Sequence, residues 1–475
     1  MKFGYHLALP SIIGKGAGGL GLLVLALLAP ATRAHEVGIN TAYAPNIREE
    51  TMRRWAVGTG ANTARVGMRM DLSQRHPGHA DNWVRDFSGQ GRWTLGFLFN
   101  KSAPHKLTAD QTEWGIRPPG GLWDPIFDND SDSAAPGAAL NPKNEWAVFV
   151  ARMVERYDAD GQDDAPGSPR VTYFSVWNEP DWMPWPHRPD TAFSRTMKNW
   201  WGQNFHDLAR LVFISHRVAR WANPNSKVGL QLCFPESLGF LLDDHTHPLA
   251  RNCDFVDFHA YAGPGADDNV FRGDGLLPIL RAMQAQYTKR NLPLPAFLCT
   301  ETGLSGGVSG TPSGRAQAAA AIKVNVAGAA AGLIMTCWYA LTDPSWKDMG
   351  LIADVSQLPG DGAGATLKDA YDALRTVALL LKPDVKFVEE IAVGSGAHAY
   401  RFRNAAGHHL IVAWADDKAG PDATATVALP LKPGTWKRMR WDFARTGQPD
   451  GAVTATAGAT RLTLDTMPIF LQAED

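Results

Sequence analysis

The chain has 475 residues, of which 45% are hydrophobic and 20% are charged, a composition typical of a folded globular protein rather than a disordered one. Its length exceeds that of one typical small domain and suits a large domain followed by a smaller one. The formal net charge of −2 at pH 7 argues against binding to nucleic acid or to an anionic membrane surface, because both attract basic proteins.

The N-terminal segment has the composition of a secretory signal. Lys2 and Lys15 precede the apolar run 20–29, and small residues follow up to Ala34. The run is shorter than the ~20 residues that a membrane-spanning helix needs, and the order of basic, apolar and small residues is typical of a signal peptide. We therefore expect residues 1–34 to be removed, leaving His35 as the first residue of an exported protein without a membrane segment. The alternative is an uncleaved membrane anchor, and the sequence does not distinguish the periplasm from the medium.

Residues 35–383 alternate between strand and helix patterns. The expected strands are Val37–Tyr43, Ala61–Met68, Trp93–Asn100, Val171–Trp177, Lys227–Cys233, Phe255–Tyr261, Ala296–Thr300 and Gly332–Leu341. The expected helices are Ile47–Val57, Lys143–Tyr157, Phe205–Ala222, Leu276–Tyr287, Ala316–Ala331 and Lys368–Leu381. Eight strands that alternate with helices predict a parallel α/β sheet closed into a (β/α)8 TIM barrel.

From residue 384 to residue 475 the helical pattern stops. Short strand patterns are separated there by Gly, Pro and Asp turns. The expected strands are Lys386–Ile391, Ala397–Arg403, His408–Ala415, Ala423–Leu429, Trp436–Asp442 and Thr460–Gln472. This pattern predicts a small antiparallel β-sandwich domain.

A long irregular stretch, 101–142, separates the third strand from the next helix. The alternating acids of 128–132 are similar to a calcium-binding loop, but Ser133 stands where such a loop has glycine, and Ala139 stands where it has glutamate. A solvated loop or a cleft wall is therefore favoured over a calcium site. No CxxC pattern or Cys/His cluster in the sequence predicts another metal site.

The four cysteines are Cys233, Cys253, Cys299 and Cys337. Cys299 and Cys337 lie within apolar strand patterns, where free cysteine behaves as a small hydrophobic residue, so we expect buried thiols. A disulfide between Cys233 and Cys253 remains an alternative, because disulfides form in exported proteins.

Two glutamates follow strand patterns. Trp177-Asn178-Glu179-Pro180 ends the fourth strand, since proline cannot donate to a ladder hydrogen bond, and Glu301 ends the seventh. In a TIM barrel these strand ends carry the catalytic groups. Glycoside hydrolysis needs two carboxyl groups, one to protonate the leaving oxygen and one to assist the anomeric carbon. The pair therefore predicts a glycosidase, although the sequence does not give the spacing that separates retention from inversion.

The Trp177–Pro180 motif, combined with a glutamate at the end of the seventh strand, resembles the retaining glycosidases built on (β/α)8 barrels. Within this clan the chain most resembles glycoside hydrolase family 39, the β-xylosidase and α-L-iduronidase family, and related bacterial exopolysaccharide glycosidases. The resemblance covers the whole mature chain in architecture, a barrel followed by a β-sandwich. It implies that Glu179 is the general acid/base and that Glu301 is the nucleophile.

The resemblance also implies roles for residues around the nucleophile. Asn178 would contact the sugar 2-hydroxyl. Arg65 would hold Glu301 ionised, although Arg69 is a close alternative on the same strand. Tyr261 would place its hydroxyl near the nucleophile.

Three further residues are candidates for substrate contact. His259 would line the catalytic subsite, and Trp338 would form the aromatic floor under the sugar; for each, the alternative is an ordinary core residue. Trp182, which lies close to Trp185 in the loop after the fourth strand, would either contact substrate or pack the loop.

We therefore expect an exported retaining glycosidase that cleaves β-linked glycosidic bonds of a polysaccharide or oligosaccharide by double displacement. No cofactor is expected, because the two carboxyl groups can carry out the proton transfers and the nucleophilic attack themselves. The alternatives are a catalytically silent carbohydrate-binding protein and a transglycosylase, and the C-terminal domain would either support the barrel or bind carbohydrate. The loop after the third strand and the segment 351–367 depart from the family pattern. These loops shape the cleft, so the sequence does not identify the sugar, the linkage or endo as opposed to exo action. It does not give the oligomeric state either.

Overall fold

The computed structural model describes residues 35–41, 44–88, 93–99, 119–181, 205–307, 309–343 and 348–474. These residues form a barrel followed by antiparallel sheets. The expected signal segment 1–34 and Trp182 lie outside the described residues. Within the described part of the chain, no helix is both long enough and apolar enough to cross a bilayer.

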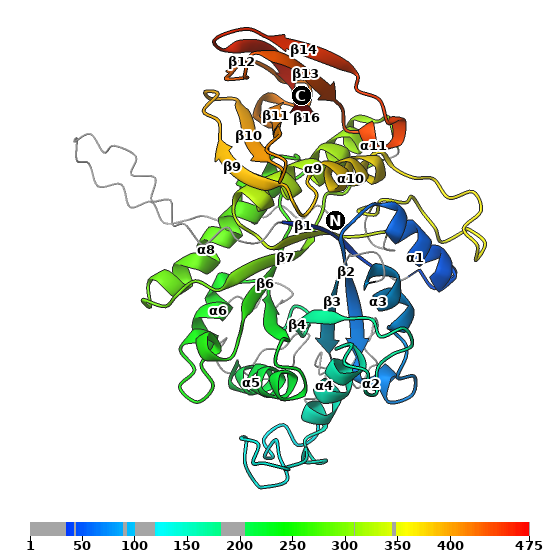
Figure 1. The fold of residues 1–475 in the computed structure, drawn as a ribbon, viewed down its shortest axis with the longest axis vertical. Coiled ribbons are helices and arrows are strands. Elements are labelled where there is room, and N and C mark those ends of the chain that lie inside the picture. The colour runs from blue at the N-terminus through cyan, green and yellow to red at the C-terminus, as the bar shows by residue number, and fades with distance from the viewer. Residues whose placement is uncertain are drawn as a thin grey trace, which may run out of the picture. The chain divides into compact units, whose positions relative to one another are not determined.

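Eight parallel strands close the barrel in the order of the sequence, because β1 pairs with both β2 and β8. The strands are β1 (Glu36–Asn40), β2 (Thr63–Arg69), β3 (Trp93–Phe99), β4 (Val171–Val176), β5 (Lys227–Leu232), β6 (Phe255–Ala260), β7 (Ala296–Thr302) and β8 (Met335–Trp338). Figure 1 shows them running together with helices around them. The predicted (β/α)8 fold class is confirmed.

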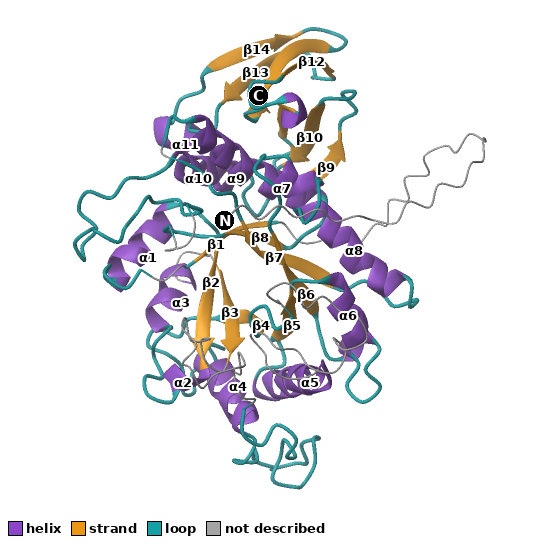
Figure 2. Cartoon of the chain, turned by 180° about the vertical axis from the view of Figure 1, so that it is seen from behind, coloured by secondary structure: helices purple, strands orange, loops and turns teal. Residues whose placement is uncertain are grey.

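The helices are α1 (Glu49–Gly58), α2 (Met70–Ser73), α3 (Asp81–Ser88), α4 (Glu145–Arg156), α5 (Phe205–Ala222), α6 (Pro235–Leu242), η1 (Leu249–Arg251), α7 (Asp268–Phe271), α8 (Leu276–Thr288), α9 (Pro312–Ala330), α10 (Asp369–Leu380), η2 (Asp417–Ala419) and α11 (Phe443–Thr446). The longer helices between the barrel strands bury residues in the core, whereas η2 and α11 belong to the C-terminal region and bury none. Side-chain caps set two of their starts: the Asn144 carbonyl accepts from the Ala147 N–H, and the Thr311 hydroxyl accepts from the Gly314 N–H. Figure 2 shows strands inside the ring of helices and again in the C-terminal region.

The C-terminal region contains a six-stranded antiparallel sheet and a two-stranded one. The strands are β9 (Lys386–Glu390), β10 (Ala397–Arg403), β11 (His409–Ala415), β12 (Thr424–Leu429), β13 (Gly434–Met439), β14 (Gly451–Ala455), β15 (Thr460–Asp465) and β16 (Ile469–Ala473). Side chains from the two sheets share one apolar core, so the sheets pack face to face. The single expected strand Thr460–Gln472 is wrong: it is divided into β15 and β16, and Pro468, which has no N–H to donate, lies between them.

A buried acid joins the barrel to the C-terminal sheets. Asp267, just before α7, accepts from Lys323 Nζ at 3.1 Å, from Trp414 Nε1 at 3.0 Å and from the Asp417 N–H at 2.7 Å. Lys323 belongs to α9, whereas Trp414 belongs to β11. The side chains of Asp267 and Lys323 are at most 1% exposed. One carboxylate therefore satisfies a buried cation of the barrel and two donors of the C-terminal domain.

We expect Asp267→Asn to lower the free energy of unfolding by about 3–5 kcal/mol, because it leaves the Lys323 ammonium buried without its counter-charge. Urea unfolding of the full chain measures the loss. Asp450→Asn is the matched control, since it breaks an exposed pair with Arg438 and should cost at most about 1 kcal/mol. Equal losses in the two variants would contradict the importance of the buried pair.

Candidate active site

The C-terminal ends of four barrel strands bring the predicted site residues together. Arg65 lies on β2, His259 on β6 and Glu301 on β7, and Glu179 follows β4 directly. His259 and Glu301 are register partners on adjacent strands. Because all eight strands are parallel, their ends form one rim of the barrel.

The turn that carries Glu179 has an unusual backbone. Trp177 has φ of 62° and Glu179 has φ of 47°, in the left-handed region, which costs a residue other than glycine on the order of 1–3 kcal/mol. Neighbouring strands hold the turn: the Trp177 N–H donates to Leu98 O at 2.7 Å, and the Glu179 N–H donates to the Gln231 side-chain oxygen. The strained turn fixes the position of the Glu179 carboxyl at the rim.

Asp181 ties this turn to the end of β5. Its carboxylate accepts the N–H groups of Cys233 at 2.8 Å and Phe234 at 2.9 Å, and the residue is fully buried. Burial raises the pKa of Asp181 to about 6, although these hydrogen bonds act in the opposite direction. The segments after β4 and β5 therefore form one rigid unit.

Two donors hold the Glu301 carboxylate. Arg65 Nη1 lies 2.5 Å from Glu301 Oε1, and the Tyr261 hydroxyl donates to Oε2 at 2.9 Å. Arg65 also donates to Asn178 Oδ1 at 2.8 Å. Burial is the main reason that the pKa of Tyr261 stays well above its usual value, so its hydroxyl keeps its proton. Arg65 and Tyr261 together fix the position of the Glu301 carboxylate and place a positive charge beside it.

Arg69, the alternative to Arg65, lies elsewhere. Its guanidinium pairs with Asp71, with Nη2 2.6 Å from Oδ2. Of the two arginines, only Arg65 is brought to Glu301.

A chain of hydrogen bonds lies behind Glu179. His259 Nδ1 is 2.7 Å from Glu179 Oε1, and His259 Nε2 is 3.3 Å from the Thr300 hydroxyl. Thr300 donates to Asp257 Oδ1 at 2.7 Å, and Ser175 donates to Asp257 Oδ2 at 2.8 Å. Burial lowers the pKa of His259 to about 3 and raises the pKa of Asp257 to about 7.

This chain determines where the protons lie when Asp257 is ionised. His259 is neutral near pH 7 and carries one ring proton. The Thr300 hydroxyl donates a hydrogen bond to Asp257. Its oxygen can therefore accept a hydrogen bond from an N–H at His259 Nε2. With the ring proton on Nε2, His259 Nδ1 is an acceptor, and its short contact with Glu179 is a hydrogen bond that a protonated Glu179 donates. In this tautomer a carboxyl that donates to His259 lies beside a carboxylate that is paired with Arg65.

His259 also limits the distance between the two carboxyl groups. Its Nδ1 lies 2.7 Å from Glu179 Oε1 and 3.4 Å from Glu301 Oε2. The two oxygens can be no farther apart than the sum of these distances, which is below the roughly 6.5–9.5 Å spacing of inverting glycosidases.

The two predicted tryptophan contacts have different outcomes. Trp338 is fully buried, and its ring nitrogen donates to Met349 O at 3.0 Å. This burial favours the alternative role of a core residue over that of an exposed sugar platform. Trp182 lies outside the described residues.

Sequence reasoning missed the polar residues that support the pair. Asp257 precedes His259 by two positions, so strand alternation gives them the same face, and this was an available signal. Thr300 lies on β7 next to Glu301 and Gln231 lies on β5, but the partners of both come from other strands, so no local pattern points to them. Asp181 lies within the loop motif, but its partners are backbone groups after β5.

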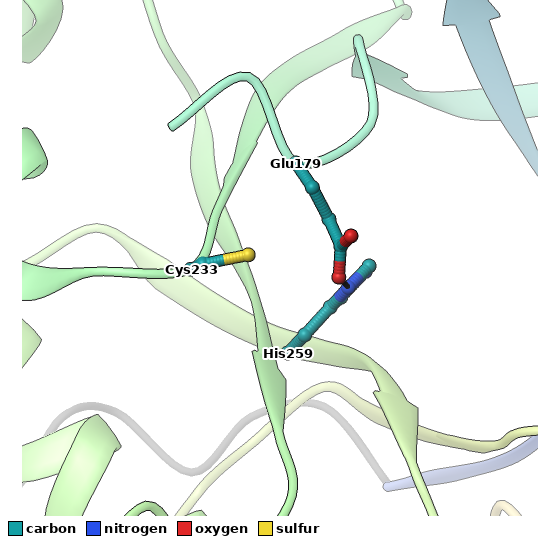
Figure 3. Close-up of side chains that lie close together, drawn as sticks. All are labelled: Glu179, Cys233 and His259. Atoms are coloured by element: carbon teal, nitrogen blue, oxygen red, sulfur yellow. Dashed lines mark hydrogen bonds and ion pairs between the residues drawn. The ribbon is translucent and has the colours of Figure 1, made fainter. Parts of the chain in front are cut away.

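All four cysteines are free thiols, so the alternative disulfide between Cys233 and Cys253 does not form. Cys299 and Cys337 are buried, as predicted. Cys233 lies beside Glu179 and His259, and the three side chains offer ligand atoms within 4.8 Å of one another (Figure 3).

The aspartates that are similar to a calcium loop do not form a cluster of ligands within the described residues. Asp132 instead pairs with Arg210, with 2.5 Å between Oδ2 and Nη1. Asp128 accepts the Ala139 N–H at 3.1 Å. These contacts give Asp128 and Asp132 a place in the hydrogen bonding of the loop.

No protein-family model matches the chain, and no curated protein sequence does. Similar solved structures include a family 39 glycoside hydrolase from Bacteroides cellulosilyticus WH2, with a TM-score of 0.58 and 14% identity over 94% of this chain and 82% of that one. A family 30 endoxylanase from Clostridium papyrosolvens C71 has a TM-score of 0.55 and 14% identity, over 93% of this chain and 97% of that one. An α-L-arabinofuranosidase from Thermotoga maritima has a TM-score of 0.58 and 10% identity, over 94% of this chain and 98% of that one. At these identities the likeness establishes a shared fold, and the predicted resemblance to this group is confirmed at that level.

The buried Asp257 should make stability depend on pH. Its folded pKa of about 7 lies above the ordinary aspartate value of 3.8, so the folded protein holds an additional proton between these pH values. The free energy of unfolding should therefore fall by about 3 kcal/mol as pH rises from about 4 to 7. Asp257→Asn should remove this contribution, which urea unfolding at several pH values in the window measures. Parallel pH profiles for the two proteins would contradict the prediction.

Proposed function

We propose that the chain is an exported retaining glycoside hydrolase that cleaves β-linked glycosidic bonds of a polysaccharide or oligosaccharide. The observation that carries the proposal is the pair Glu179 and Glu301, held close together by His259 in different electrostatic surroundings. The names of the structurally similar proteins support the same reaction class. Export rests on the composition of residues 1–34.

In the proposed first step, Glu179 gives its proton to the glycosidic oxygen while Glu301 attacks the anomeric carbon. The bond to the leaving group breaks, and an ester forms between Glu301 and the sugar. Arg65 and Tyr261 orient Glu301 and keep its lone pairs available. In the second step Glu179, now a carboxylate, takes a proton from water as the water oxygen displaces Glu301 from the anomeric carbon.

Two other functions use the same site. A transglycosylase would pass the sugar from Glu301 to an acceptor hydroxyl instead of water, and product analysis separates the two reactions. A carbohydrate-binding protein without activity would have no need for a protonated carboxyl beside an ionised one. The polar arrangement around Glu179 and Glu301 therefore favours catalysis.

Glu179→Gln and Glu301→Gln should each lower hydrolysis of the best substrate by roughly 10²-fold or more, because each removes a group that makes or breaks bonds. A screen of aryl β-glycosides and bacterial polysaccharides with the mature protein identifies that substrate. Glu50→Gln, an exposed residue of α1, is the matched control and should keep full activity. Full activity in either site variant would contradict the two-glutamate mechanism.

Azide separates the roles of the two glutamates. It should restore turnover of an activated aryl glycoside by Glu179→Ala with retention, since azide replaces water in the second step. It should give the inverted glycosyl azide with Glu301→Ala, since azide then attacks from the side that the nucleophile occupied. The opposite assignment of the two products would exchange the roles of the glutamates.

Thr300→Val should move the basic limb of the pH profile of kcat/KM to lower pH by about one unit. A shift of one pH unit corresponds to about the net free energy of one hydrogen bond. Without the hydroxyl, His259 can carry its proton on Nδ1 and donate to an ionised Glu179, which favours loss of the acid. Thr300→Ser keeps the hydroxyl and should restore the wild-type profile. A uniform loss of rate with no shift of the limb would assign Thr300 a structural role only.

A further inference from the structure

Three residues with metal-binding side chains converge beside the proposed acid. Glu179 follows β4, Cys233 follows β5 and His259 lies on β6, so three adjacent strands each contribute one ligand (Figure 3). Their ligand atoms lie within 4.8 Å of one another. In a tetrahedral zinc site such atoms are about 3.3–3.6 Å apart, so modest side-chain rotation brings the three into range.

The backbone that carries these ligands is already rigid. The carboxylate of Asp181 accepts the N–H groups of Cys233 and Phe234, and Gln231 accepts the N–H of Glu179. The segments after β4 and β5 are thus held at a fixed separation. Binding an ion would order few additional groups, which favours affinity.

His259 has the outer partner that metal-binding histidines require. Its Nε2 contacts the Thr300 hydroxyl, which donates to the buried carboxyl of Asp257. This link orients the ring and leaves Nδ1 with a lone pair on the side of Glu179.

The charges and ligand types also fit. Arg65 already balances Glu301, so Glu179 and a Cys233 thiolate can balance the two positive charges of a divalent cation. A set of one sulfur, one imidazole nitrogen and one carboxylate oxygen suits Zn²⁺ and the chemically similar Co²⁺.

We propose that Glu179, Cys233 and His259 form a binding site for a thiophilic divalent cation of the Zn²⁺ type, and that the bound ion inhibits catalysis. On binding, the S–H bond of Cys233 breaks, its proton passes to solvent, and a sulfur–metal bond forms. The ion also takes the lone pair of His259 Nδ1 and a carboxylate oxygen of Glu179, which can then no longer deliver a proton to a leaving group. The inhibition rests on the proposed function, whereas the binding does not.

Binding is tested without substrate by titrating the full mature chain, first treated with a chelator, with Co²⁺. We expect a thiolate-to-cobalt charge-transfer band with the visible bands of tetrahedral Co²⁺, and we expect Zn²⁺ to abolish both by displacement. Cys233→Ser should lose the charge-transfer band and bind Zn²⁺ at least 10-fold more weakly. Cys253→Ser is the matched control, because Cys253 is also a partly exposed free thiol and its Sγ instead donates to Phe255 O.

A wild-type chain without a thiolate band would overturn the inference, and so would a band that survives in Cys233→Ser. Inhibition is then measured within each protein as the hydrolysis rate without Zn²⁺ divided by the rate with Zn²⁺. This ratio should be large for wild type and Cys253→Ser and close to one for Cys233→Ser. A chain that binds Co²⁺ through Cys233 but cleaves no glycan would uphold the binding site and contradict the proposed function. Hydrolysis that Zn²⁺ leaves unchanged in wild type would overturn the inhibitory role.

Discussion

The buried ion pair between Arg65 and Glu301 is the interaction on which the site depends. It crosses the barrel from β2 to β7, and its guanidinium is only 3% exposed. Burying such a charge is costly unless a partner and further hydrogen bonds compensate it, and Asn178 supplies one of these. The pair therefore joins segments of β2, β4 and β7 and holds the Glu301 carboxylate beside Asn178.

His259 makes the surroundings of Glu179 different from those of Glu301. It contacts both glutamates through one nitrogen and a buried relay through the other. Since burial keeps the ring neutral, hydrogen bonds rather than a charge on the ring connect Glu179 through His259 to Thr300. In the tautomer with its proton on Nε2, the lone pair on Nδ1 that accepts from a protonated Glu179 is also the one that would bind a metal ion.

Much of the fold follows from the order of the sequence, because strand and helix periods alternate along the barrel. Glu179 and Glu301 were predictable from their positions at strand ends. Arg65 could not be separated from Arg69 in the sequence, since both lie on one face of β2, and in the structure Arg69 pairs with Asp71. Residues such as Thr300, Gln231 and Cys233 escaped prediction because their partners come from other strands, and contacts between strands leave no local pattern.

The central claim is that Glu301 forms a covalent bond to the sugar, and trapping that intermediate tests it most directly. The full mature chain would be treated with a panel of 2-deoxy-2-fluoro-β-glycosyl fluorides, digested and analysed by mass spectrometry. We predict that one sugar of the panel adds a single glycosyl group to the peptide that contains Glu301. A label on Glu179 or another carboxylate, or no label with any member of the panel, would contradict the account.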